Sequence, residues 1–107
     1  MAETVFVQVA PLEELPAGER IFVEFDSQPV VLFNIGGTIY AIGDVCTHDN
    51  GPLGDGELDG LQIICPRHGA RFDLSNGKAV SLPAVKPTPW YPVRVVDGMI
   101  EIGIPTK

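Results

Sequence analysis

Glycine and proline interrupt this chain so often that long regular helices are excluded. The sequence holds 12 glycines and 10 prolines in 107 residues. No window of about twelve residues keeps a helical 3.6-residue period without one of these breakers. The segments between them are short and rich in Val, Ile and aromatic residues, which favour strands. The sequence therefore predicts a mostly β protein.

The turn residues indicate how these segments are connected. Gly36-Gly37, Asn76-Gly77 and Asp97-Gly98 supply the positive φ values that two-residue hairpin turns require. Residues 11–15 are expected to form a short helical turn that Pro16 ends. The expected strands are residues 5–9, 21–25, 30–35, 38–42, 61–64, 71–73, 78–80, 91–96 and 99–102.

Two stretches lack strand character. Residues 43–60 contain five acidic residues and no basic residue, and we interpret them as a functional loop. Residues 81–89 contain three prolines, which make the backbone extended and stiff. This second stretch is expected to act as a rigid cover.

The chemically informative residues are the two cysteines and the two histidines. They occur as two pairs, Cys46-x-His48 and Cys65-x-x-His68, with 16 residues between His48 and Cys65. Two thiolates and two imidazoles in two loops suit one shared metal centre. A tetrahedral Cys2His2 zinc site is the commoner use of such a donor set. Typical zinc fingers, however, pair Cys with Cys and His with His, and this chain pairs Cys with His.

These pairs, with Gly69 directly after the second one, resemble the signature of Rieske [2Fe-2S] proteins. The resemblance extends over nearly the whole chain and is closest to the small Rieske-type ferredoxins of ring-hydroxylating oxygenase systems. It implies that Cys46 and Cys65 bind one iron of a single [2Fe-2S] cluster, and His48 and His68 the other. It also implies an all-β Rieske fold in one domain, residues 1–107. Small antiparallel sheets would then carry an inserted cluster-binding subdomain at about residues 43–73.

The resemblance also bears on the reduction potential. Two ferric ions, two sulfides, two thiolates and two neutral imidazoles sum to zero charge, which places Rieske potentials at about −150 to +300 mV. The high-potential branch of the family has a disulfide at the positions of Gly51 and Arg67, and two hydroxyl donors at those of Ala70 and Phe72. This chain has neither feature. Together with the acids of residues 43–60, these absences predict a reduction potential near the low end of the Rieske range.

The function implied by the resemblance is electron transfer and not catalysis. The sequence shows no second cofactor motif. The expected role is that of a soluble one-electron carrier between a flavin-dependent NAD(P)H reductase and a terminal ring-hydroxylating oxygenase. In that family a proline-containing loop covers the cluster, and residues 81–89, around Pro83, resemble it. The alternatives are a Rieske-type small subunit of a larger reductase, such as nitrite reductase, and a structural zinc module.

Composition limits the other function classes. Seven Lys and Arg against 14 Asp and Glu give a net charge of −7, which nucleic acid or an anionic membrane would repel. The longest aliphatic or aromatic run, residues 30–33, is too short for a membrane span, and residues 1–10 lack the basic region of a secretory signal. We therefore expect a cytoplasmic protein, and an electron carrier of this size is expected to be a monomer.

Overall fold

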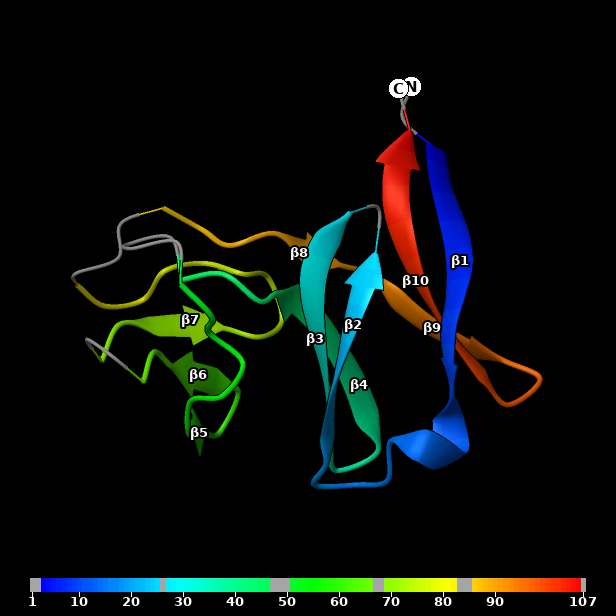
Figure 1. Cartoon of the computed structure of the whole chain (residues 1–107), viewed down its shortest axis with the longest axis horizontal. Helices are drawn as coiled ribbons and strands as arrows, with labels where there is room; N and C mark the ends of the chain where they lie inside the picture. The colour runs from blue at the N-terminus through cyan, green and yellow to red at the C-terminus, as the bar shows by residue number, and fades with distance from the viewer. Residues whose placement is uncertain (1–2, 26, 47–50, 67–68, 83–85, 107) are drawn as a thin grey trace.

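The computed structural model describes residues 3–25, 27–46, 51–66, 69–82 and 86–106 and consists mainly of antiparallel strands (Figure 1). Within these ranges there is no α-helix, and one 3-10 helix, η1 (Leu12–Glu14), occurs where residues 11–15 predicted a helical turn. The strands are β1 (Glu3–Pro11), β2 (Arg20–Phe25), β3 (Gln28–Ile35), β4 (Thr38–Gly43), β5 (Leu58–Asp59), β6 (Gln62–Ile64), β7 (Arg71–Asp73), β8 (Trp90–Tyr91), β9 (Val93–Val96) and β10 (Met99–Thr106). The prediction of an all-β fold made of small antiparallel sheets is confirmed.

The strands form three sheets, with orders β1-β10-β9, β2-β3-β4-β8 and β5-β6-β7. We call the first two sheets the body and the third the small sheet. In Figure 1 the small sheet lies to the left of the body. β1 pairs with β10 from Glu3 opposite Thr106 to Pro11 opposite Met99, so the two ends of the described chain lie side by side.

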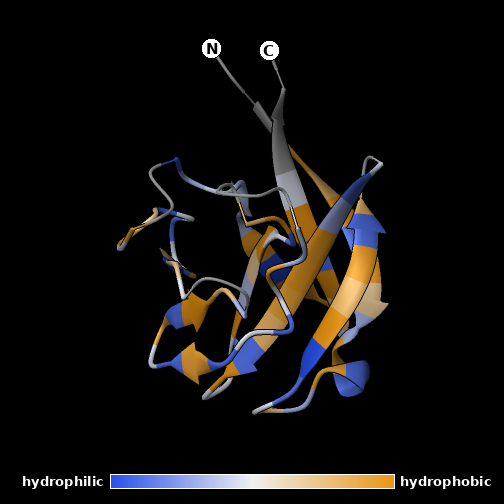
Figure 2. Ribbon diagram, turned by 60° about the vertical axis from the view of Figure 1, so that its left-hand side comes forward, coloured by the Kyte–Doolittle hydropathy of each residue, from blue (hydrophilic) through white to orange (hydrophobic). Residues whose placement is uncertain are grey.

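β3 is buried on both faces because it lies between two cores. Val30 and Leu32 pack with residues of β10 in the first core, which joins the two sheets of the body. Val31 and Phe33 pack with residues of the small sheet in the second core. Successive side chains of a strand point to opposite faces, so this uninterrupted apolar run serves both cores. Figure 2 shows hydrophobic residues concentrated on the strands, with hydrophilic residues at several strand ends.

Two of the three predicted hairpin turns are confirmed. Gly36 and Gly37 connect β3 to β4 with φ values of 63° and 94°. Asp97 and Gly98 connect β9 to β10 with φ values of 52° and 76°. The sequence did not indicate the tight turn between β2 and β3, in which Ser27 has a φ of 63°.

The prediction for Asn76-Gly77 is wrong in detail. The backbone N–H of Gly77 donates to the carbonyl of Asp73 at 2.7 Å, and Asp73 N–H donates to Lys78 at 2.9 Å, so the loop is longer than two residues. Only Gly77 of the pair has a positive φ. Residues 78–80, which follow this loop, do not form the predicted strand. They pair with β7 only through one isolated antiparallel bridge, between Phe72 and Ala79.

Two further strand predictions need correction. Residues 43–60 were expected to contain no strand, yet β5 pairs with β6 through Leu58 and Asp59. Two residues are too short a segment for periodicity to reveal. The predicted strand 91–96 is divided at Pro92 into β8 and β9, which belong to different sheets. Proline has no N–H to donate, so it marks the point where the chain leaves one sheet for the other.

Among the described residues, no helix is long and apolar enough to cross a membrane.

Candidate metal centre

Cys46 follows β4 and is completely buried. Its backbone N–H donates to the carbonyl of Gly51 at 2.8 Å. The predicted ligand His48 lies outside the described residues. Of the first Cys-His pair, the structure therefore describes only the cysteine.

Cys65 directly follows β6 and is also buried. Its backbone N–H donates to the carbonyl of Ala70 at 2.7 Å, and its carbonyl accepts from Gly69 N–H at 3.0 Å. Gly69 has a φ of 74°, a conformation that favours glycine and allows this tight return to β7. His68 and Arg67 lie outside the described residues.

The fold brings the two predicted cysteine ligands into one core. Cys46 and Cys65 both belong to the buried cluster that also contains Leu53, Ala70 and Phe72. They come from different sheets, since one follows the body strand β4 and the other follows β6 of the small sheet. The second core is thus the place where the two cysteine-bearing segments meet.

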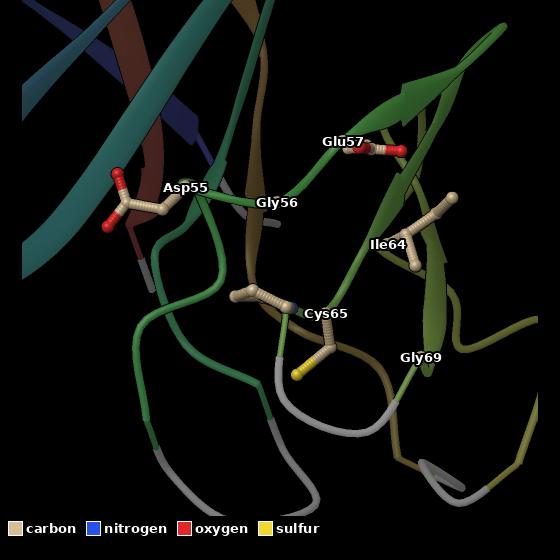
Figure 3. A pocket seen from close by; sticks show the side chains of 7 residues that line it. Asp55, Gly56, Glu57, Ile64, Cys65 and Gly69 are labelled. Carbon is tan, nitrogen blue, oxygen red and sulfur yellow. The ribbon is translucent and has the colours of Figure 1, made fainter.

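A pocket of about 470 Å³ opens beside Cys65. Figure 3 shows the Cys65 sulfur pointing away from the carboxylates of Asp55 and Glu57. Among the described residues, no group of three or more His, Cys, Asp and Glu side chains could hold a metal ion. The two described cysteines share one core, and soft sulfur ligands of this kind suit iron or zinc.

Within the segment between the two cysteines, Gly56 lies in close contact with the strand that leads to Cys65. A Cβ added to Gly56 would lie 1.8 Å from the carbonyl oxygen of Ile64, the residue before Cys65. The Ile64 N–H also donates to the carbonyl of Glu57 at 2.9 Å. These contacts fix the loop before β5 directly against the residue that precedes the second cysteine.

The acids of residues 43–60 have different environments. Asp44 Oδ1 accepts hydrogen bonds from the backbone of Leu53 and Gly54 at 2.9 and 2.5 Å. Asp59 forms an ion pair with Arg71 at 2.8 Å, so its charge has a nearby partner. Asp55 and Glu57 are exposed and line the pocket. Asp49 lies outside the described residues.

Ala70 and Phe72 follow the second cysteine in the chain and share its core. Both are completely buried in the core that contains Cys46 and Cys65. Neither side chain has a hydroxyl group. The core that holds both cysteines is therefore apolar at the two positions where the high-potential branch has donors.

Both ends of the proline-rich stretch are held by hydrogen bonds to other segments of the chain. Ser81 Oγ accepts from the backbone N–H of Arg71 at 3.0 Å. The Thr88 N–H donates to Gly77 at 2.8 Å, and the Gly43 N–H donates to Pro89 at 2.7 Å. No strand forms between residues 81 and 89 in the part described, as predicted; Pro83 is outside it.

Sequence reasoning missed Arg20. Its guanidinium reaches the loop between the two cysteines and donates to the carbonyls of Gly54 and Gly56 at 2.5 and 2.7 Å. These residues are 34 and 36 positions away in the chain. A single arginine at the start of a strand carries no signal that would reveal so distant a contact.

Comparison with known proteins agrees with this geometry. Residues 5–92 match the Rieske [2Fe-2S] domain family. The chain is 43% identical over 101 residues to the 3-phenylpropionate/cinnamic acid dioxygenase ferredoxin subunit of Escherichia coli K12, covering 92% of this chain and 93% of that protein.

Solved structures are similar as well. The ferredoxin of carbazole 1,9a-dioxygenase from Nocardioides aromaticivorans IC177 has a TM-score of 0.84 and 33% identity, with 92% of this chain and 96% of that chain covered. The complex of reduced oxygenase and oxidized ferredoxin in carbazole 1,9a-dioxygenase contains a chain with a TM-score of 0.82 and 29% identity, with 92% of each covered.

The chain belongs to the Rieske [2Fe-2S] domain family. The cofactor of this family is one Rieske-type [2Fe-2S] cluster, so that cluster is the metal centre of this protein. The relatives named above are ferredoxins of dioxygenase systems. The protein is accordingly an electron carrier and not an enzyme.

Proposed function

We propose that Cys46, His48, Cys65 and His68 hold the cluster, with the cysteines on one iron and the histidines on the other. The buried position of both cysteines in one core supports this assignment. Their backbone bonds to Gly51 and Ala70 hold each cysteine at the base of its loop. In this proposal residues 43–73 form the cluster-binding subdomain of a single domain.

When bound, such a cluster takes up and releases one electron. We propose that the protein accepts this electron from a flavin-dependent NAD(P)H reductase and delivers it to a terminal ring-hydroxylating oxygenase. The observation that carries the proposal is the 43% identity to a dioxygenase ferredoxin subunit over 92% of the chain. A structurally similar ferredoxin has been solved in complex with its oxygenase, which supports the oxygenase as acceptor.

The charge of the chain suits transient encounters with both partners. The net charge is −7, and Asp55 and Glu57 are exposed beside Cys65. Long-range attraction to a basic surface accelerates association and weakens as salt is added. We propose that the protein acts as a cytoplasmic monomer that meets its reductase and oxygenase in turn.

The test is a reconstituted electron relay. The purified protein is mixed with NADH, a flavin-dependent reductase and the terminal oxygenase of a phenylpropionate dioxygenase. We expect the visible spectrum to bleach after NADH and reductase are added, and to recover when oxygenase, its substrate and oxygen follow. A Cys46→Ser variant is the control and should show neither change. Absence of bleaching in the wild-type protein with an intact cluster would contradict the proposed place in the relay.

A further inference from the structure

Arg20 connects the body to the loop between the two cysteines. It is the first residue of β2, and its Nη1 donates to the carbonyls of both Gly54 and Gly56. Its guanidinium carbon lies 5.1 Å from the ring centroid of Phe33, the residue opposite Arg20 in the strand pairing. Stacking on an aromatic ring restricts the guanidinium, so less freedom is lost when it donates these bonds.

Asp44 holds the same loop from its amide side. Its Oδ1 accepts from the backbone N–H groups of Leu53 and Gly54. Asp44 is itself anchored on the body, because its backbone N–H donates to the carbonyl of Pro29 at 2.9 Å. The Arg20 guanidinium therefore binds two backbone carbonyls of the loop 53–56, and the Asp44 carboxylate binds two of its backbone N–H groups. Hydrogen bonds to ionised groups are the stronger ones.

The loop held in this way touches both cysteine-bearing segments. Leu53 is buried in the same core as Cys46 and Cys65. Gly56 lies so close to the Ile64 carbonyl that a Cβ would not fit between them. Displacement of residues 53–56 would therefore change the packing around both sulfurs.

We infer that Arg20 and Asp44 are positioning residues that form a clamp on the loop 53–56 and thereby fix the two cysteine segments relative to each other. The inference rests on the proposed ligands, Cys46 and Cys65. A cluster bound by both segments depends on their spacing. Release of the clamp should therefore weaken cluster retention more than it weakens the fold of the body.

The chain offers a matched control in Arg94. Its guanidinium carbon lies 4.1 Å from the ring centroid of Phe6, and its Nε donates to Glu101 Oε1 at 2.7 Å. Arg94 thus stacks on a phenylalanine and is held by a strong acceptor, as Arg20 is, but it belongs to β9 in the sheet formed with β1 and β10. Substitution there removes a similar set of contacts without touching the loop 53–56.

The experiment compares Arg20→Met with Arg94→Met as cluster-loaded proteins. Loss of visible absorbance in excess EDTA measures cluster release, and circular dichroism measures the fold. We expect Arg20→Met to release its cluster about tenfold faster than the wild type, because two hydrogen bonds from a charged donor are lost. Arg94→Met should stay within about twofold. The electron paramagnetic resonance spectrum of reduced Arg20→Met should also broaden, whereas that of Arg94→Met should not.

Arg20→Lys keeps the charge but not the planar fork, and we expect a release rate between those of wild type and Arg20→Met. If circular dichroism shows that Arg20→Met is unfolded, the comparison of Arg20→Lys with Arg94→Lys decides: faster release from Arg20→Lys supports the clamp. Equal release rates in the matched Arg20 and Arg94 variants overturn it. A wild-type protein that binds no cluster overturns the proposed function together with the clamp.

Discussion

The body and the small sheet are built in different ways. β1, β3 and β10 in the body have eight or nine residues, and the body core consists of fully or largely buried aliphatic and aromatic side chains. The strands of the small sheet have only two or three residues. The loops around this sheet are held by individual hydrogen bonds and by close glycine contacts. Apolar burial therefore supports both regions, and the loops of the site depend in addition on a few specific contacts.

Replacement of the proposed histidine ligands should have the largest effect. His48→Ser or His68→Ser removes one of four ligands, and we expect loss or severe alteration of the cluster. The visible spectrum and iron content measure it, while circular dichroism should show a retained body. An unchanged visible spectrum in both variants would show that the histidines are not ligands.

A substitution in the body core should lower the stability of the fold and leave the cluster unchanged. Leu32 is completely buried among residues of both body sheets. Leu32→Ala should lower the free energy of unfolding by about 2–5 kcal/mol, through lost burial and a residual cavity. Urea unfolding measures this effect, and the reduction potential of the folded fraction should stay unchanged. A shifted potential would mean that the two regions are coupled more closely than their separate cores indicate.

Gly56→Ala tests the close contact in the site. The new Cβ would meet the Ile64 carbonyl at 1.8 Å, so the backbone must shift. We expect a loss of about 1–3 kcal/mol in unfolding free energy and faster cluster release. The control is Gly60→Ala in the turn between β5 and β6, where there is open space but a φ of 60°; it should cost about 1 kcal/mol without changing cluster release. Equal cluster release in the two variants would contradict the account.

The smallest effect is expected from restoring hydroxyl donors. The double variant Ala70→Ser and Phe72→Tyr places hydroxyls in the core that holds Cys46 and Cys65. Donors to the sulfur atoms stabilise the reduced, more negative cluster, so the reduction potential should rise. The rise should be about 40 mV per bond, if each bond contributes ~1 kcal/mol to a one-electron couple. Protein-film voltammetry measures the shift, and an unchanged potential would show that these positions do not face the cluster.

The same contrast explains what the sequence could predict. β3 and β4 were located because a long apolar run meets the Gly36-Gly37 turn, and both signals are local. β5 was missed and residues 78–80 were overestimated, because pairing partners decide the structure of such short segments.

Within the site, the two Cys-His pairs stand out by residue type and spacing alone. Arg20 and Gly56 do not, because their roles depend on contacts made only after the body and the small sheet come together. The sequence therefore indicates the candidate ligands, whereas the contacts that position the two cysteine-bearing segments are visible only in the structure.

The most direct test of the central claim is the electron paramagnetic resonance spectrum of the dithionite-reduced protein, recorded together with its visible spectrum before reduction. The account predicts a brown protein with an anisotropic signal whose average g lies below that of an all-cysteine [2Fe-2S] cluster, as mixed cysteine and histidine ligation requires. A colourless protein that is silent after reduction and contains zinc instead of iron would contradict it.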